Sequence, residues 1–142
     1  MASAKDYERQ VTQILGVKPD RRGMVKLRFE WDTIQEAKQL LSEVRQMQKR
    51  LRLVKKDINA DIKSIRARYS SKIHSATPDL GDKLLFGKGK AKSRAAAKKR
   101  SIRASKDREV KPYENVKRSI DQALIELDAL KLNVTTWIDQ NK

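Results

Sequence analysis

The stretch LLSEVRQMQKRLRLVKKDINADIKSIRARY, residues 40–69, decides the fold, because its apolar side chains recur at helical spacing. The spacing places them on one face of an α-helix, and that face needs a second helix to cover it. Neither glycine nor proline occurs between residues 32 and 77, so the pattern predicts one long helix over 32–72. The apolar positions are Leu40, Val44, Met47, Leu51, Val54, Ile58, Ile62, Ile65 and Tyr69.

A second apolar face follows in residues 109–142, where a strict heptad spacing predicts another helix. Pro112 is expected in its first turn, a position that tolerates proline well. Two apolar faces of similar length, joined by one connection, predict a long antiparallel two-helix coiled-coil hairpin, and the fold class is therefore all-α. The positions of this second face are Tyr113, Val116, Ile120, Ala123, Leu127, Leu130, Val134 and Trp137.

The N-terminal residues 1–31 are expected to cover one end of this hairpin. A short helix is predicted over 3–16, with Ser3 as its N-cap and Gly16 at its end. An extended or β-like segment follows at 25–31, where Val25, Leu27, Phe29 and Trp31 alternate with charged residues. Because the sequence offers no partner strand, this segment either pairs with a second copy of itself or lies with its apolar side on the helices.

Further expectations concern the N-terminal end of the first long helix. Asp32 is expected to cap it, with Gln35 completing a capping box. Trp31 is expected to lie near Trp137 where the hairpin begins. Together with the alternating residues of 25–31, Trp137 forms the predicted partner interface of the protein.

Charge is the most unusual feature of the composition. Lys and Arg number 34 against 18 Asp and Glu, which gives a formal net charge of +16. Residues 83–108 carry most of this excess, with Asp107 as their only acid. Such a concentration of positive charge favours a polyanionic partner, nucleic acid first. The basic residues are Lys83, Lys88, Lys90, Lys92, Arg94, Lys98, Lys99, Arg100, Arg103, Lys106 and Arg108.

The connection 73–108 is predicted to be a basic flexible loop, with Gly81, Gly87 and Gly89 as hinges. The stretch between Gly81 and Lys88 resembles a phosphate-binding loop only superficially. Its glycines are separated by five residues where four are required, and Gly89 follows the lysine in place of Ser or Thr. Nucleotide hydrolysis is therefore not expected.

The remaining composition narrows the chemistry further. The chain has no cysteine and one histidine, so no disulfide and no Cys/His metal site is expected, and no cofactor is predicted. No leader sequence or long apolar stretch is evident, so a cytoplasmic location is expected and a membrane partner is not.

Together these features predict a non-enzymatic protein that binds RNA or DNA. The basic residues of 83–108 would contact the phosphate backbone with little sequence specificity. The alternative is a structural or adaptor coiled-coil protein, which would assemble a protein complex through its helical faces and the segment 24–31. In that case its partner is another protein or a second copy of the chain.

Overall fold

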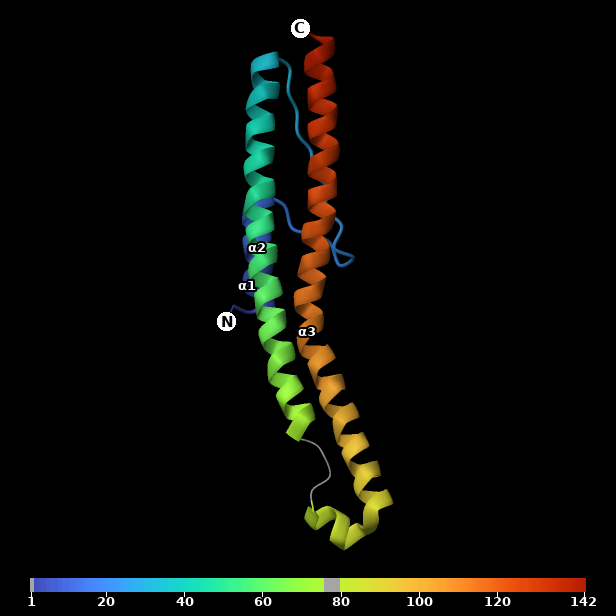
Figure 1. The fold of residues 1–142 in the computed structure, drawn as a ribbon. Coiled ribbons are helices and arrows are strands. Elements are labelled where there is room, and N and C mark those ends of the chain that lie inside the picture. Colours follow the sequence, from blue (N-terminus) through green and yellow to red (C-terminus); the bar gives the residue numbers. More distant parts are fainter. Residues whose placement is uncertain (1, 76–79) are drawn as a thin grey trace. The chain divides into compact units, whose positions relative to one another are not determined.

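The computed structural model describes residues 2–75 and 80–142, with side chains given for 2–75 and 92–142. The chain forms α1 (Ala4–Leu15), α2 (Ile34–Ser75) and α3 (Leu80–Gln140) in this order (Figure 1). The long helices α2 and α3 pack in antiparallel fashion, and no strand forms in the described residues. The prediction of an all-α protein with two long helices is therefore confirmed.

The chain divides into two compact units, which are described in turn. The first unit comprises Met1–Asn59 and Glu114–Lys142, and so contains α1, the start of α2 and the end of α3. The second unit, Ala60–Tyr113, contains the end of α2 and the start of α3.

The core of the first unit consists of the apolar faces that the sequence predicts. These side chains are buried because each helix covers the face of the other, and their burial supplies the main stabilisation of the unit. The most deeply buried are Val44, Leu51, Ile58, Ile120, Leu127 and Val134.

Polar contacts set the register of the two helices around this core. The amide nitrogen of Gln48, which is almost fully buried, donates to Oδ1 of Asp128 at 2.7 Å. On the same helix pair, Nζ of Lys55 lies 2.5 Å from Oδ1 of Asp121. A buried amide loses its bonds to water, so a shift of the helices that separated Gln48 from Asp128 would leave it unpaired at a cost of about 1–3 kcal/mol.

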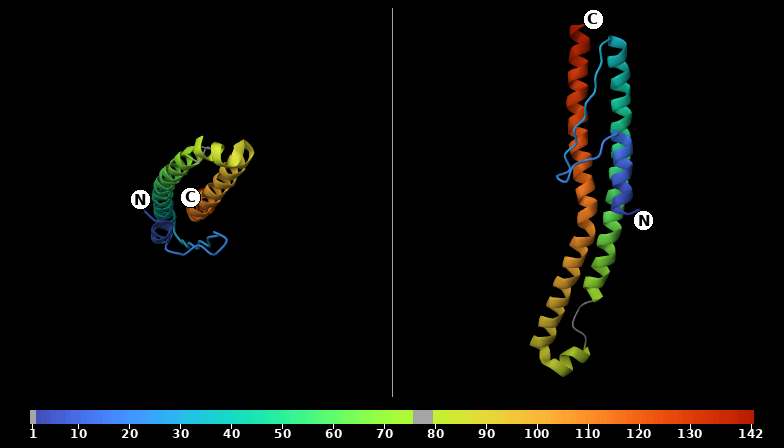
Figure 2. Two further views of the ribbon diagram at one scale, coloured as in Figure 1. Left: turned by 90° about the horizontal axis from the view of Figure 1, so that it is seen from below. Right: turned by 180° about the vertical axis from the view of Figure 1, so that it is seen from behind.

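The short helix α1 is capped at both ends by local sequence. The Ser3 hydroxyl accepts from the backbone N–H of Asp6, whose carboxylate accepts in return from the N–H of Ser3. Gly16 ends the helix with φ of +73°, a left-handed conformation that glycine adopts without strain. Tyr7, Val11 and Leu15 are buried, and α1 lies beside α2 in both views of Figure 2.

The segment 25–31 is extended chain and not a strand. Val25 is 4% exposed, Leu27, Phe29 and Trp31 are half-buried, and the charged residues between them are exposed. Its alternation therefore comes from one side lying on the helices, which was one of the two arrangements left open by the sequence. Trp31 packs edge-on against Trp137 of α3, with ring centroids 6.2 Å apart and an interplanar angle of 85°. The predicted proximity of the two tryptophans is confirmed.

The predicted cap of α2 was wrong by one residue. The hydroxyl of Thr33, not the carboxylate of Asp32, accepts from the backbone N–H of Glu36. The Glu36 carboxylate accepts from the N–H of Asp32, so Gln35 takes no part in this cap. The capping hydroxyl must lie three residues before its donor, and the helix begins at Ile34, so Thr33 has the required position.

The prediction of a loop over 73–108 was also wrong, because α2 extends to Ser75 and α3 begins at Leu80. Gly81, Gly87 and Gly89, expected as hinges, lie within α3, whereas residues 76–79 lie outside the described part of the chain. Pro112 is an interior residue of α3 and does not start a helix. An interior proline costs about 3 kcal/mol. Packing offsets that cost here, since Val110 and Val116 on either side are buried.

Candidate nucleic-acid interface

Basic side chains dominate the second unit. Residues 60–75 and 92–113 together contain thirteen Lys and Arg but only three acids, Asp61, Asp107 and Glu109. The described part of this unit therefore carries a strong positive charge, whereas the first unit has 18 basic residues against 13 acidic ones. This places the candidate interface on the second unit.

The predicted nucleic-acid-binding residues all belong to α3. Lys92, Arg94, Lys98, Arg100, Arg103 and Arg108 are exposed, while Lys99 and Lys106 are half-buried. The structure gives a helix where we expected a loop because the segment is rich in Ala, Lys and Arg, which are strong helix formers. Lys83, Lys88 and Lys90 also fall within the bounds of α3, but their side chains lie outside the described residues.

The two half-buried lysines lie on the face of α3 that packs in the second unit. Counting back from Tyr113 in steps of four and three residues reaches Glu109, Lys106, Ile102, Lys99 and Ala95, and each of them is half-buried. The heptad pattern of the C-terminal residues thus continues into the basic segment, with charged residues at positions that are usually apolar. Only Ala95 and Ile102 give this face apolar residues, so the apolar pattern of the sequence does not reveal the face.

The exposed cations surround the rest of the α3 surface. At 100° per residue, Lys92 and Arg103 lie beside Lys99 at one edge of the packed face, and Lys98 lies at the opposite edge. Arg100 lies on the side away from the packed face. The segment therefore presents positive charge in several directions.

One carboxylate is held among the cations of the second unit. Oε1 of Glu109 accepts from Nη2 of Arg68, and Oε2 accepts from the hydroxyl of Tyr69. The cation of Lys72 lies 4.8 Å from the centroid of the Tyr69 ring, and the guanidinium of Arg68 lies 5.2 Å from it. These four residues, which we call the Glu109 cluster, join α2 to α3 within this unit.

The cluster shifts the pKa values of its members in opposite directions. The hydrogen bond from Tyr69, followed by that from Arg68, lowers the pKa of Glu109, because both stabilise the ionised carboxylate. The same bond to Glu109 raises the pKa of Tyr69, because ionisation would remove the proton that Tyr69 donates to the carboxylate. The ionised Glu109 also raises the pKa of Arg68. The cluster is therefore most stable with Glu109 ionised and Tyr69 protonated.

A pH titration should show this coupling. The contribution of Glu109 to stability is fully present above the ordinary carboxyl pKa of about 4.3, and it is lost as the pH falls through the lowered value. We expect Tyr69→Phe to move the pKa of Glu109 back up, as measured by NMR of the Glu109 carboxyl carbon. Tyr7→Phe, in the first unit, is the matched control and should leave that titration unchanged. An unaltered Glu109 titration in Tyr69→Phe would contradict the assignment.

The predicted partner interface lies in the first unit. Val25 is buried by the chain itself, whereas Leu27, Phe29, Trp31 and Trp137 each keep part of their surface exposed. Contact of these residues with another protein stays a prediction. Among the described residues, no three His, Asp or Glu side chains gather closely enough to hold a metal ion, and no helix combines the length and apolar character needed to cross a bilayer.

No protein-family model, curated protein or solved structure matches this chain, so its function has to be argued from its own residues.

Proposed function

We propose that this is a non-enzymatic protein that binds RNA or DNA, in which two long helices form a coiled-coil hairpin and the basic residues of 83–108 contact the phosphate backbone. The observation that carries the proposal is the concentration of exposed cations on α3, among which Asp107 and Glu109 are the only acids of residues 92–113. Each cation that neutralises a phosphate releases counterions, and this release supplies the affinity.

The kind of contact follows from the residues available. No aromatic side chain occurs between Lys92 and Arg108, so base stacking of the kind used by single-strand-binding folds has no platform in that range. Lys and Arg contacts to phosphate carry no direct sequence information. Binding with weak sequence preference is therefore proposed.

The chemical environment of the cations supports a binding role and not a catalytic one. The basic side chains of residues 92–108 stand on a helix surface and are mostly exposed to solvent. Acid–base catalysis depends on shifted pKa values in an enclosed pocket, which an exposed helix surface does not supply.

Salt dependence tests the proposal directly. Labelled duplex and single-stranded RNA and DNA are titrated with the protein at several salt concentrations, and binding is followed by fluorescence anisotropy. With six phosphate contacts, we expect log K for duplex DNA to fall against log salt with a slope of roughly −5. Weak binding with a flat slope for all four nucleic acids would refute the proposal.

A second candidate function is a structural or adaptor protein that assembles a complex, and two observations in the first unit favour it. Ile125 and Leu132 lie seven residues apart on one side of α3 and are 62% and 68% exposed. The backbone of 25–31 makes no backbone hydrogen bond in the described structure, so the exposed part of this extended segment can pair with another chain. In this case sedimentation should show assembly that persists without nucleic acid. The double substitution Ile125→Glu with Leu132→Glu should abolish that assembly.

A further inference from the structure

A turn of the first unit is organised around one carboxylate. Oδ1 of Asp20 accepts from the backbone N–H groups of Arg22 at 2.8 Å and Met24 at 2.9 Å. The N–H of Gly23 donates to the carbonyl oxygen of Asp20 at 3.0 Å. The N–H of Asp20 donates to the carbonyl oxygen of Met24, also at 3.0 Å. These four bonds fix the backbone from Asp20 to Met24, so the side chains of Arg21 and Arg22 leave from defined positions.

This turn is also held closely against α3. Gly23 is buried with φ of +80°, and a Cβ at this position would come within 3.0 Å of Oγ of Ser119 and 3.6 Å of its backbone nitrogen. Glycine adopts this left-handed conformation without strain, whereas a Cβ at this position would press on the Ser119 hydroxyl. The turn is thereby fixed beside α3, 96 residues further along the chain.

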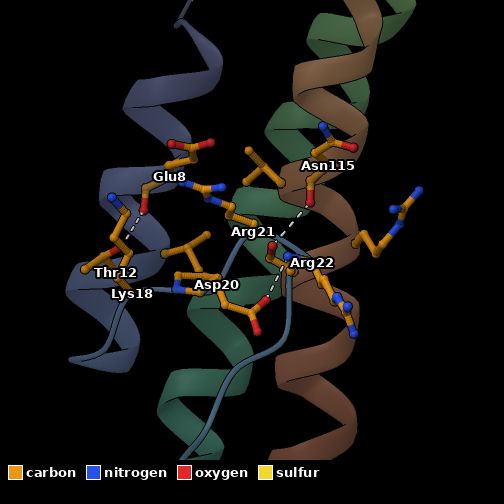
Figure 3. A pocket seen from close by; sticks show the side chains of 13 residues that line it. Glu8, Thr12, Lys18, Asp20, Arg21, Arg22 and Asn115 are labelled. Atoms are coloured by element: carbon orange, nitrogen blue, oxygen red, sulfur yellow. Dashed lines mark hydrogen bonds between the residues drawn. The ribbon is translucent and has the colours of Figure 1, made fainter.

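A pocket of about 360 Å³ opens between α1, this turn and α3, all within the first unit (Figure 3). Its lining includes the buried side chains of Val11, Val116 and Ser119 together with exposed charged residues. Pockets for small ligands begin at about 300 Å³, so the volume admits a mononucleotide-sized molecule.

The charged part of the lining is predominantly basic. Lys18, Arg21 and Arg22 come from the turn, and Arg118 comes from α3. Two acids also line the pocket, Glu8 and Asp20, and Figure 3 shows Arg21 extending toward Glu8. Four cations against two carboxylates leave the lining with a positive excess, although backbone N–H groups hold the charge of Asp20 within its own turn.

We propose that this pocket binds a phosphate monoester, whether on a free phosphorylated small molecule or at the end of a nucleic acid. Guanidinium groups bind phosphate oxygens with paired, charge-assisted hydrogen bonds, and several cations that line one pocket from a rigid turn and a helix suit a dianion better than a monoanion. The pocket shares no residue with the basic segment of α3, so this inference does not depend on the function proposed above.

NMR titration of the full chain in phosphate-free buffer tests the site. Adenosine 5′-monophosphate and inorganic phosphate should shift the amide signals of Gly23 and Ser119 saturably at constant ionic strength, whereas adenosine should not. Arg21→Gln with Arg118→Gln should weaken adenosine monophosphate binding by at least about tenfold, because two charge-assisted contacts are removed. The matched control is Arg45→Gln with Arg50→Gln on α2, which should bind normally. All four arginines are exposed, so these substitutions should leave thermal unfolding unchanged.

A short oligonucleotide with a 5′-phosphate, compared with its 5′-hydroxyl form, identifies the source of the phosphate. A saturable shift of Gly23 with the 5′-phosphate form but not with the 5′-hydroxyl form assigns the site to a nucleic-acid end, and no difference between the two forms at Gly23 assigns it to a free small molecule. The proposal is overturned if adenosine shifts the same signals or if sodium chloride reproduces the effect. It also fails if the control variant loses as much affinity. Loss of binding on neutralising only the basic residues of 83–108 would likewise exclude this pocket while leaving the nucleic-acid proposal intact.

Discussion

Replacement of Lys92, Lys98, Arg100 and Arg103 by Gln is expected to weaken binding to duplex DNA or RNA by 10²- to 10³-fold, an order-of-magnitude figure for about 0.15 M salt. All four side chains are exposed on α3, so their loss should remove phosphate contacts without removing packing. If each makes one contact, the slope of log K against log salt should become shallower by roughly 3 to 4 units. Fluorescence anisotropy across salt concentrations measures both quantities.

A matched variant separates local contact from overall charge. The control variant replaces Lys5, Arg28, Lys38 and Arg45 by Gln. It also removes two lysines and two arginines, but from exposed positions of the first unit. Both variants have the same formal net charge. If the proposal holds, the control keeps its affinity and its salt slope apart from a small nonspecific loss. Equal weakening of both variants would mean that total charge, and not the basic segment of α3, drives binding.

The second large effect is expected in the core of the first unit. Leu51→Ala should lower the free energy of unfolding by about 2–5 kcal/mol, because Leu51 is fully buried and its truncation leaves a cavity between packed helices. Urea denaturation followed by tryptophan fluorescence measures this loss. Trp31 and Trp137 both belong to the first unit, so the signal reports on that unit.

Leu53→Ala is the control on the same helix. Leu53 is 55% exposed, and alanine is at least as good a helix former as leucine, so the change should stay within about 0.5 kcal/mol. A similar loss in both variants would show that the buried face of α2 is assigned incorrectly.

The sequence predicted the helical parts of the fold wherever apolar residues mark the packed face. Leu51 and Leu127 follow such a pattern and are buried as expected. The pattern failed in the basic segment and at the residue after it, where Lys99, Lys106 and Glu109 occupy positions on the packed face. Extending the heptad of the C-terminal residues backward from Tyr113 would have revealed the helix, because the spacing continues although the residue types change.

The candidate sites were predictable to different degrees. The basic residues of α3 could be named from composition alone, since net charge needs no knowledge of the fold. The Glu109 cluster and the pocket beside Gly23 could not, because each joins residues that are distant in the chain. Their proximity depends on the register of α2, α3 and the turn, and contacts such as Gln48 with Asp128 set this register only in the folded structure.

Pro112 has a consequence for the way α3 melts. Proline has no N–H, so the carbonyl of Arg108 lacks the backbone partner that it would otherwise have four residues ahead. This gap in the hydrogen-bond ladder falls next to Tyr113, where the second unit ends. The cooperativity of a helix depends on an unbroken ladder. We therefore expect opening of α3 on one side of Pro112 to stop there, so that amide hydrogen exchange separates this one helix into two foldons.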